Sequence, residues 1–149
     1  MSDMQIPGNT TFNNPSDERV KTILTEMKRI AVIGISAKED RASHGIARFL
    51  LGQGFDVVGV NPVLKDPVLG LEIYPSLKDV PGTVDVVNIF RRSDQVSPII
   101  EEAINRGDKC VWLQEQVINP EAGAEASAAG LDVLMDVCIY KEWLRLMNG

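Results

Sequence analysis

Cysteine and histidine are scarce in this sequence. The two cysteines, Cys110 and Cys138, stand far apart and form no CxxC pair, and His44 is the only histidine. Zinc sites in proteins need several such ligands at short spacings, so we expect no metal site. We also expect both thiols to be reduced, as they are in cytosolic proteins.

Long apolar runs and an excess of positive charge are absent as well. No stretch reaches the roughly 18 apolar residues that span a bilayer, and no basic flank followed by an apolar run opens the chain. The formal net charge is -6, whereas DNA and anionic membranes attract positive surfaces. We therefore expect a cytoplasmic protein that binds neither nucleic acid nor membranes.

The length and composition fit one ordinary domain. The chain has 149 residues, of which 44% are hydrophobic and 24% charged, and this size allows a core without disulfides or a structural metal. Residues 1–14 are rich in Asn, Thr and Gly, which predicts a flexible N-terminal arm. Residues 15–149 then form a single domain.

Short apolar runs rich in β-branched residues alternate with helical patterns in that domain. Gly54, Gly107 and Gly130 each follow a helical pattern and precede an apolar run, where a left-handed residue is needed. The alternation indicates an α/β fold, a doubly wound, Rossmann-like parallel sheet of about five strands with helices on both faces. The strands are predicted at residues 30–35, 55–60, 84–90, 109–114 and 131–136, and the helices at 16–28, 44–53, 94–106, 120–129 and 140–147.

The segment 62–81 breaks this alternation. It holds four prolines and has no clear helical period, so we expect an irregular crossover between strands. Within it we expect a small hairpin around Gly70 and one helical turn at residues 76–79.

The loop after the first strand has a composition that suits a phosphate group. It reads GISAKEDRASHG, in which Gly34 and Ser36 let the backbone come close to a ligand. The amides at the start of the following helix point toward an anion, and Lys38 and Arg41 add positive charge. In the alternative interpretation this is a solvated turn, and Ser43 is a plain N-cap.

An NAD-binding site is the main competing interpretation, since dinucleotides bind at the same turn. The fingerprint G-x-G-x-x-G needs glycines where this chain has Ser36 and Glu39. The acid that usually holds the adenosine ribose is replaced by Asn61, followed by Pro62. These differences weaken the NAD(P) interpretation without removing it, because sites that bind a 2′-phosphate lack that acid.

Several short motifs occur in a specific order along the chain. In this order they resemble the small, single-domain CoA-binding proteins, which are similar to the amino-terminal domain of the succinyl-CoA synthetase α subunit. The resemblance covers residues 30–138 and implies a Rossmann-like fold that binds coenzyme A (CoA) at the carboxyl edge of its sheet. The motifs are IAVIGIS, RAS, VNP, VDVVNIFRRS, KCVWLQ and GLDVLMDVC.

The resemblance also implies which residues bind the ligand. The phosphates of CoA would lie near the first loop, and the adenine would lie between later loops. Cations gathered at one sheet edge suit a ligand with several phosphates. The implied cofactor-binding residues are Gly34, Ile35, Ser36, Lys38, Arg41, Ser43, Asn61, Pro62, Phe90, Arg91 and Arg92. The sequence departs from the family pattern at Ala42, His44, Gly45 and Val137.

For several individual side chains we expect an ordinary structural role. We expect His44 to be an exposed surface side chain and Trp112 to be a core residue. At least one of Arg91 and Arg92 is expected to pair with a nearby carboxylate rather than with a ligand. Trp143 is expected to cover an edge of the domain or a contact in a homodimer.

No set of residues in the sequence makes a convincing nucleophile and base. The leading hypothesis is therefore a protein that binds CoA or an acyl-CoA without a complete catalytic site of its own. One alternative is an NAD(P)-binding small oxidoreductase or a subunit of one. Another is a thiol-protecting role, in which Cys138 forms a mixed disulfide with CoA.

Overall fold

A computed structural model describes residues 12–147, and its centre is one open parallel sheet. The sheet has six strands in the order β3-β2-β1-β4-β5-β6, and every neighbouring pair is parallel. The predicted doubly wound α/β class is thus confirmed. The strands are β1 (Arg29–Ile33), β2 (Asp56–Val60), β3 (Ile73–Tyr74), β4 (Val86–Ile89), β5 (Cys110–Leu113) and β6 (Asp132–Leu134).

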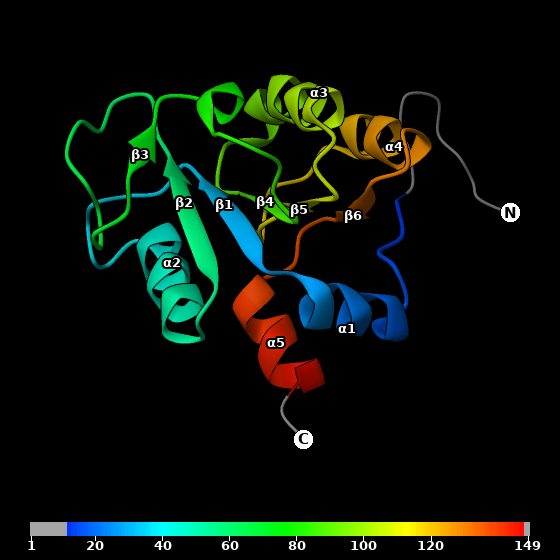
Figure 1. The fold of residues 1–149 in the computed structure, drawn as a ribbon. Helices are drawn as coiled ribbons and strands as arrows, with labels where there is room; N and C mark the ends of the chain where they lie inside the picture. The colour runs from blue at the N-terminus through cyan, green and yellow to red at the C-terminus, as the bar shows by residue number, and fades with distance from the viewer. Residues whose placement is uncertain (1–11, 148–149) are drawn as a thin grey trace, which may run out of the picture.

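In the part of the chain that the structure describes, five α-helices cover the two faces of the sheet (Figure 1). α3 and α4 pack on one face, and α1, α2 and α5 pack on the other. None of the helices within residues 12–147 is long and apolar enough to cross a membrane. The helices are α1 (Asp17–Glu26), α2 (Ala42–Gly52), α3 (Val96–Arg106), α4 (Pro120–Ala128) and α5 (Ile139–Met147), with short 3₁₀ turns η1 (Leu77–Asp79) and η2 (Ser93–Gln95).

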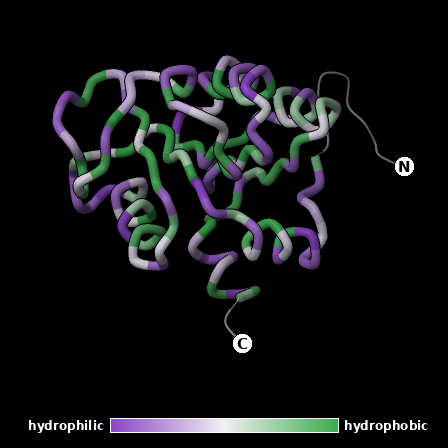
Figure 2. The backbone as a smooth tube through the Cα atoms, in the orientation of Figure 1, coloured by the Kyte–Doolittle hydropathy of each residue, from purple (hydrophilic) through white to green (hydrophobic). Residues whose placement is uncertain are grey.

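The strands form the buried centre, as their hydrophobic colouring in Figure 2 indicates. Trp112 is completely buried, as predicted, and its Nε1 donates to the carbonyl oxygen of Val137 at 3.0 Å. Trp143 packs edge-on against Phe49 and Phe55, with ring centroids 6.1 and 5.7 Å away. Trp143 therefore packs against α2 and the residue before β2, and its role at a domain edge or in a homodimer stays a prediction.

The proline-rich crossover accounts for the sixth strand. Val68 and Leu71 form an antiparallel bridge around Gly70, and η1 provides the single helical turn, so both predicted features are confirmed. β3 has two residues and pairs only with the end of β2. A strand this short carries no alternating or continuous apolar pattern, which is why the sequence predicted five strands.

Carboxylates tie the loops at the amino-terminal edge of the sheet. Asp85, just before β4, accepts hydrogen bonds from the backbone N–H groups of Lys28 at 2.8 Å and Arg29 at 2.9 Å. Asp108, just before β5, accepts from the N–H of Val84 at 2.8 Å. The acids at this edge thus hold neighbouring strands in register.

The predicted N-terminal arm lies mostly outside the described residues. Of its last residues, Phe12 packs against the core cluster beneath α3 and α4. The side chain of Asn14 exchanges two hydrogen bonds with the backbone of Met135, at 3.0 and 2.8 Å. The chain is therefore attached to the β6 side of the domain before α1 begins.

Candidate functional site

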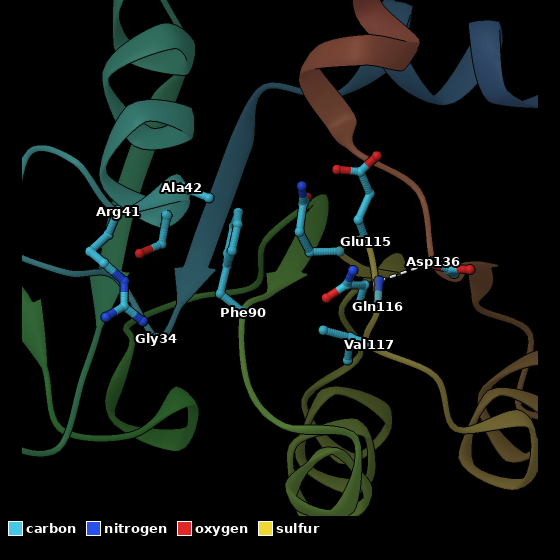
Figure 3. A pocket seen from close by; sticks show the side chains of 10 residues that line it. Gly34, Arg41, Ala42, Phe90, Glu115, Gln116, Val117 and Asp136 are labelled. Atoms are coloured by element: carbon cyan, nitrogen blue, oxygen red, sulfur yellow. Dashed lines mark hydrogen bonds between the residues drawn. The ribbon is translucent and has the colours of Figure 1, made fainter.

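A cleft of about 870 Å³ opens at the carboxyl edge of the sheet. It lies between β1 and β4, where the strand order reverses and the loops leave toward opposite faces of the sheet. Ligands of open α/β sheets bind at this switch point. Figure 3 shows the lining residues, which are Gly34, Arg41, Ala42, Ser43, Phe90, Gln114, Glu115, Gln116, Val117 and Asp136.

Gly34 forms the floor of the cleft at the exit of β1. Its φ is +87°, and its N–H donates to the carbonyl oxygen of Val60 at 2.8 Å. A Cβ atom at this position would collide with the backbone carbonyl oxygen of Phe90. Both the left-handed backbone and this close approach therefore require glycine.

The start of α2 forms the positive wall of the cleft. Arg41 is the N-cap residue, and its side chain caps no backbone N–H. The first N–H groups of a helix have no intrahelical acceptor, so they and Arg41 together suit an anion. Ser43 is not the N-cap but a buried residue inside α2 that lines the cleft, so the N-cap interpretation of Ser43 is wrong.

The prediction of an exposed His44 is wrong. Its side chain is only 5% exposed, and its Nδ1 lies 2.9 Å from the carbonyl oxygen of Ser36. The imidazole packs beneath its own loop and bridges the loop to the first turn of α2. The hydroxyl of Ser36 is also used within the loop, where it accepts from the N–H of Lys38 at 3.1 Å. Lys38 itself is exposed and does not line the cleft.

A second, smaller cavity of about 200 Å³ adjoins the cleft at Gly34. Pro62 and Arg91 line it together with apolar side chains from β1, β2, η1 and α3. The guanidinium of Arg91 donates to Oε1 of Gln95 at 2.9 Å, which positions it at the cavity. Two predicted residues that are absent from the cleft are thus found in this neighbouring space.

Besides Ser36 and Lys38, three other predicted residues lie outside both cavities. Ile35 is completely buried in the core. Asn61 donates to the carbonyl oxygen of Ile35 at 2.8 Å and accepts from the N–H of Val63 at 2.8 Å, so its side chain braces the backbone. Arg92 is largely exposed and pairs with Asp94 at 3.3 Å, as expected for at least one of the two arginines.

The loops after β5 and β6 contribute cleft residues that sequence reasoning did not select. Gln116 and Asp136 both have positive φ values, 69° and 61°, which are uncommon for residues other than glycine. The N–H of Gln116 donates to Oδ1 of Asp136 at 2.7 Å, the dashed line in Figure 3. Sequence reasoning did not select Gln116 and Asp136, because neither side chain has the positive charge that suits a phosphate.

Gln114 is the most unusual polar residue of the cleft. Its side chain is 6% exposed, and its Oε1 has no hydrogen-bond partner among the described residues. Beside it, Glu115 accepts a hydrogen bond from Nζ of Lys141 at 2.8 Å, and this bond raises the pKa of Lys141. An acidic and amide-rich wall thus faces Arg41 across the cleft.

The two cysteines lie outside the cleft. Cys110 and Cys138 are both buried and free, and neither lines the two cavities at the carboxyl edge. Burial strongly raises the pKa of the Cys110 thiol. Both therefore match the commoner role of small apolar core residues.

Comparison with known proteins identifies the family. A family model described as a CoA binding domain matches residues 28–143. The chain belongs to this CoA-binding domain family. The resemblance inferred from the sequence motifs is thereby confirmed.

Similar proteins are found in a bacterium and in an archaeon. The Bacillus subtilis (strain 168) protein YneT is 39% identical over 128 residues, which cover 86% of this chain and 94% of YneT. A hypothetical protein from Pyrococcus horikoshii OT3 is 36% identical with a TM-score of 0.86, over 99% of this chain and 100% of that chain.

A much longer protein contains a similar domain. The dinucleotide forming acetyl-coenzyme A synthetase 1 of Ca. Korarchaeum cryptofilum is 30% identical, with a TM-score of 0.63. The similarity covers 73% of this chain and 26% of the synthetase.

Proposed function

We propose that this chain binds coenzyme A or an acyl-CoA in the cleft and has no complete catalytic site of its own. The observation that carries the proposal is the position of Arg41 and the open first turn of α2 in a large cleft at the switch point. Membership of the CoA-binding domain family supports the identity of the ligand.

The two adjoining cavities suit the parts of CoA. The phosphates bind at Arg41 and the N–H groups of Ala42 and Ser43, where the positive charge lies. The smaller cavity, with Arg91 beside apolar side chains, suits the flat adenine ring. The pantetheine arm then extends into the large cleft. Gly34 lines both spaces, and because it is a glycine it has no side chain to separate them.

The arrangement of candidate catalytic groups favours binding over chemistry. His44 is buried and held by the carbonyl oxygen of Ser36, and Cys138 lies outside the cleft. Asp136 uses one oxygen to hold the backbone of Gln116. A nucleophile needs a base within hydrogen-bond reach, and these groups do not form such a pair.

Asn61 favours CoA over the competing dinucleotide. An NAD site needs a free polar side chain at the end of β2 to hold the ribose. The amide nitrogen of Asn61 donates to Ile35, and its oxygen accepts from Val63 and Leu64, at 2.8, 2.8 and 3.2 Å. Both polar atoms of the Asn61 side chain are thus already hydrogen-bonded within the protein.

Calorimetric titration with CoA, NADH and ATP tests the proposal. We expect CoA to bind at sub-millimolar concentration, and Arg41→Ala to weaken binding by about 10- to 100-fold, the usual range for a lost charged hydrogen bond. Arg48→Ala is the matched control, because Arg48 is exposed on the same helix and does not line the cleft. Absence of CoA binding together with clear NADH binding would reverse the assignment.

A further inference from the structure

The two walls of the cleft differ in charge. Arg41 and the first turn of α2 form one wall, and Gln114, Glu115 and Asp136 belong to the opposite one, which we call the acceptor wall. In Figure 3, Phe90 stands between Arg41 on one side and Glu115 and Asp136 on the other. Among the described residues that line the cleft, the acceptor wall includes no Lys or Arg.

Gln114 is the strongest evidence that this wall contacts a ligand. Its buried Oε1 has lost its hydrogen bonds to water and has gained none from residues 12–147. Such orphaned acceptors are rare in native proteins because they are unfavourable. An N–H or O–H group of a bound molecule would supply the missing partner.

The neighbouring carboxylates determine which molecules this wall tolerates. Glu115 already binds Lys141 at 2.8 Å, and Asp136 already holds the N–H of Gln116 at 2.7 Å. Lys141 is thus occupied and offers no free charge to an anion in the cleft. The acceptor wall therefore attracts hydrogen-bond donors and repels negative charge.

The orientation of CoA in the proposed function brings its arm to this wall. The phosphates stay beside Arg41, and the adenine occupies the smaller cavity on the far side of Gly34. Only the pantetheine arm and its thiol or acyl group remain to fill the large cleft. This arm is uncharged and carries amide N–H groups, the donors that the oxygen of Gln114 lacks.

We infer that the acceptor wall selects the acyl group by charge: it takes free CoA and thioesters with an uncharged acyl group, and it excludes those whose acyl group carries a carboxylate. This inference rests on the proposed binding of CoA. The N–H groups of the arm bond to Gln114, and an acyl carboxylate would face Glu115 and Asp136 without a cation.

Titration of the wild-type protein with matched thioesters tests the inference. We expect CoA and acetyl-CoA to bind within about threefold of each other, and succinyl-CoA to bind at least about tenfold more weakly, because like charges at close range repel. If none of the three binds, the proposed function fails and the inference fails with it. If all three bind equally tightly, the inference alone is wrong.

Variants of the acceptor wall test whether its carboxylates cause the weaker binding of succinyl-CoA. Glu115→Gln and Asp136→Asn should each narrow the gap in affinity between acetyl-CoA and succinyl-CoA. Glu115→Gln also frees Lys141 to pair with the acyl carboxylate. Glu101→Gln on the exposed surface of α3 makes the same charge change away from the cleft and should leave the gap unchanged. An unchanged gap in both wall variants would overturn the inference.

Gln114→Met separates ligand contact from a structural role. Methionine has a similar shape but no strong acceptor, so we expect CoA affinity to fall about three- to tenfold. The ligand-free protein should unfold at the same or a higher urea concentration, because the orphaned oxygen is gone. Unchanged affinity for CoA would show that Gln114 does not contact the arm and would contradict the inference.

Discussion

At the scale of single residues, two features require glycine at position 34, the positive φ and the close approach of Phe90, and substitutions can separate their effects. Gly34 and Gly54 have nearly the same φ, +87° and +90°, but a Cβ at Gly54 meets nothing within 4 Å, whereas one at Gly34 meets the carbonyl oxygen of Phe90. The two positions therefore share the backbone strain of a substitution and differ in the steric clash.

We expect Gly54→Ala to lower the free energy of unfolding by about 1 kcal/mol and Gly34→Ala by about 2–4 kcal/mol, since the clash adds to the strain. Urea denaturation of both variants measures the difference. Gly34→Ala should also weaken CoA binding, because the loop or Phe90 must shift, while Gly54→Ala should bind normally. Equal destabilisation of both variants would mean that Phe90 moves aside freely.

Part of the cleft lining could be predicted from sequence. Gly34, Arg41, Ser43 and Phe90, four of the residues that the resemblance implied, lie together in the cleft, and their contact with a ligand stays a prediction. Gln114 could not be found in this way, because its importance comes from burial without a partner, which only the packing of β5 against its surroundings creates. Residue type shows which groups a side chain can bind, whereas burial and hydrogen bonding in the fold determine whether the side chain is free to bind them.

Lys38 and His44 show that residue type alone can also predict the wrong position for a side chain. A cation in a loop and an imidazole at a helix start were assigned by residue type alone. Lys38 is exposed outside the cleft, and His44 is held beneath the loop by the carbonyl oxygen of Ser36. The path of a loop over its own side chains is set by tertiary packing, and no periodic pattern reports it.

At the scale of elements, Asp85 joins the α1–β1 turn to the start of β4. Burial opposes its ionisation, but hydrogen bonds from the N–H groups of Arg29 and Lys28, and the ammonium group of Lys109, outweigh burial and lower the pKa of this carboxyl. A lowered folded-state pKa stabilises the protein above the unfolded pKa of about 3.9. That stability is lost as the pH falls through the folded value.

We therefore expect Asp85→Asn to destabilise the protein by about 1–2 kcal/mol at pH 7, because a charged acceptor of two backbone bonds is lost. The difference from wild type should shrink as the pH falls below the unfolded pKa of about 3.9 and on through the lowered folded pKa, where the wild-type carboxylate also becomes protonated. Urea denaturation at pH 7 and pH 3 measures this change. Asp66→Asn, in the exposed part of the crossover, should leave the free energy of unfolding nearly unchanged at both pH values. A difference that is constant with pH would rule out the charge as the cause.

Elements with a strong pattern were predicted well from sequence, whereas the two-residue strand β3 was not. All five apolar runs are strands, and Gly54, Gly107 and Gly130 have positive φ values, as their positions required. β3 was not predicted because its two residues form no apolar pattern, and only their pairing with β2 makes them a strand. The N–H of Asn61 donates to the carbonyl oxygen of Tyr74 at 2.9 Å, so the exit of β2 recruits a short extended segment from the crossover.

At the scale of the whole molecule, cavities lie at both edges of the sheet. A cavity of about 450 Å³ at the amino-terminal edge includes Arg19 and Lys109, but these cations already pair with Asp132 at 2.6 Å and Asp85 at 3.4 Å. Among residues 12–147, no carboxylate lies within salt-bridge distance of Arg41 at the opposite edge. In a chain with a net charge of -6, the carboxyl edge thus differs from the amino-terminal edge, because among the described residues its cleft contains a cation, Arg41, that no carboxylate pairs with.

This contrast between the edges predicts where a bound anion protects the backbone. With CoA at about 100 times its Kd, global stability should rise by about 2.7 kcal/mol, so the slowest core amides should exchange roughly 100-fold more slowly. Beyond that global effect, hydrogen exchange should slow locally in residues 34–45 and 113–117, which surround the cleft. Amides beside the amino-terminal cavity should show the global change alone, and Arg41→Ala at the same CoA concentration should reduce both effects. Local protection confined to residues 104–110 and 129–132 would instead place the ligand at the amino-terminal edge and contradict the charge argument.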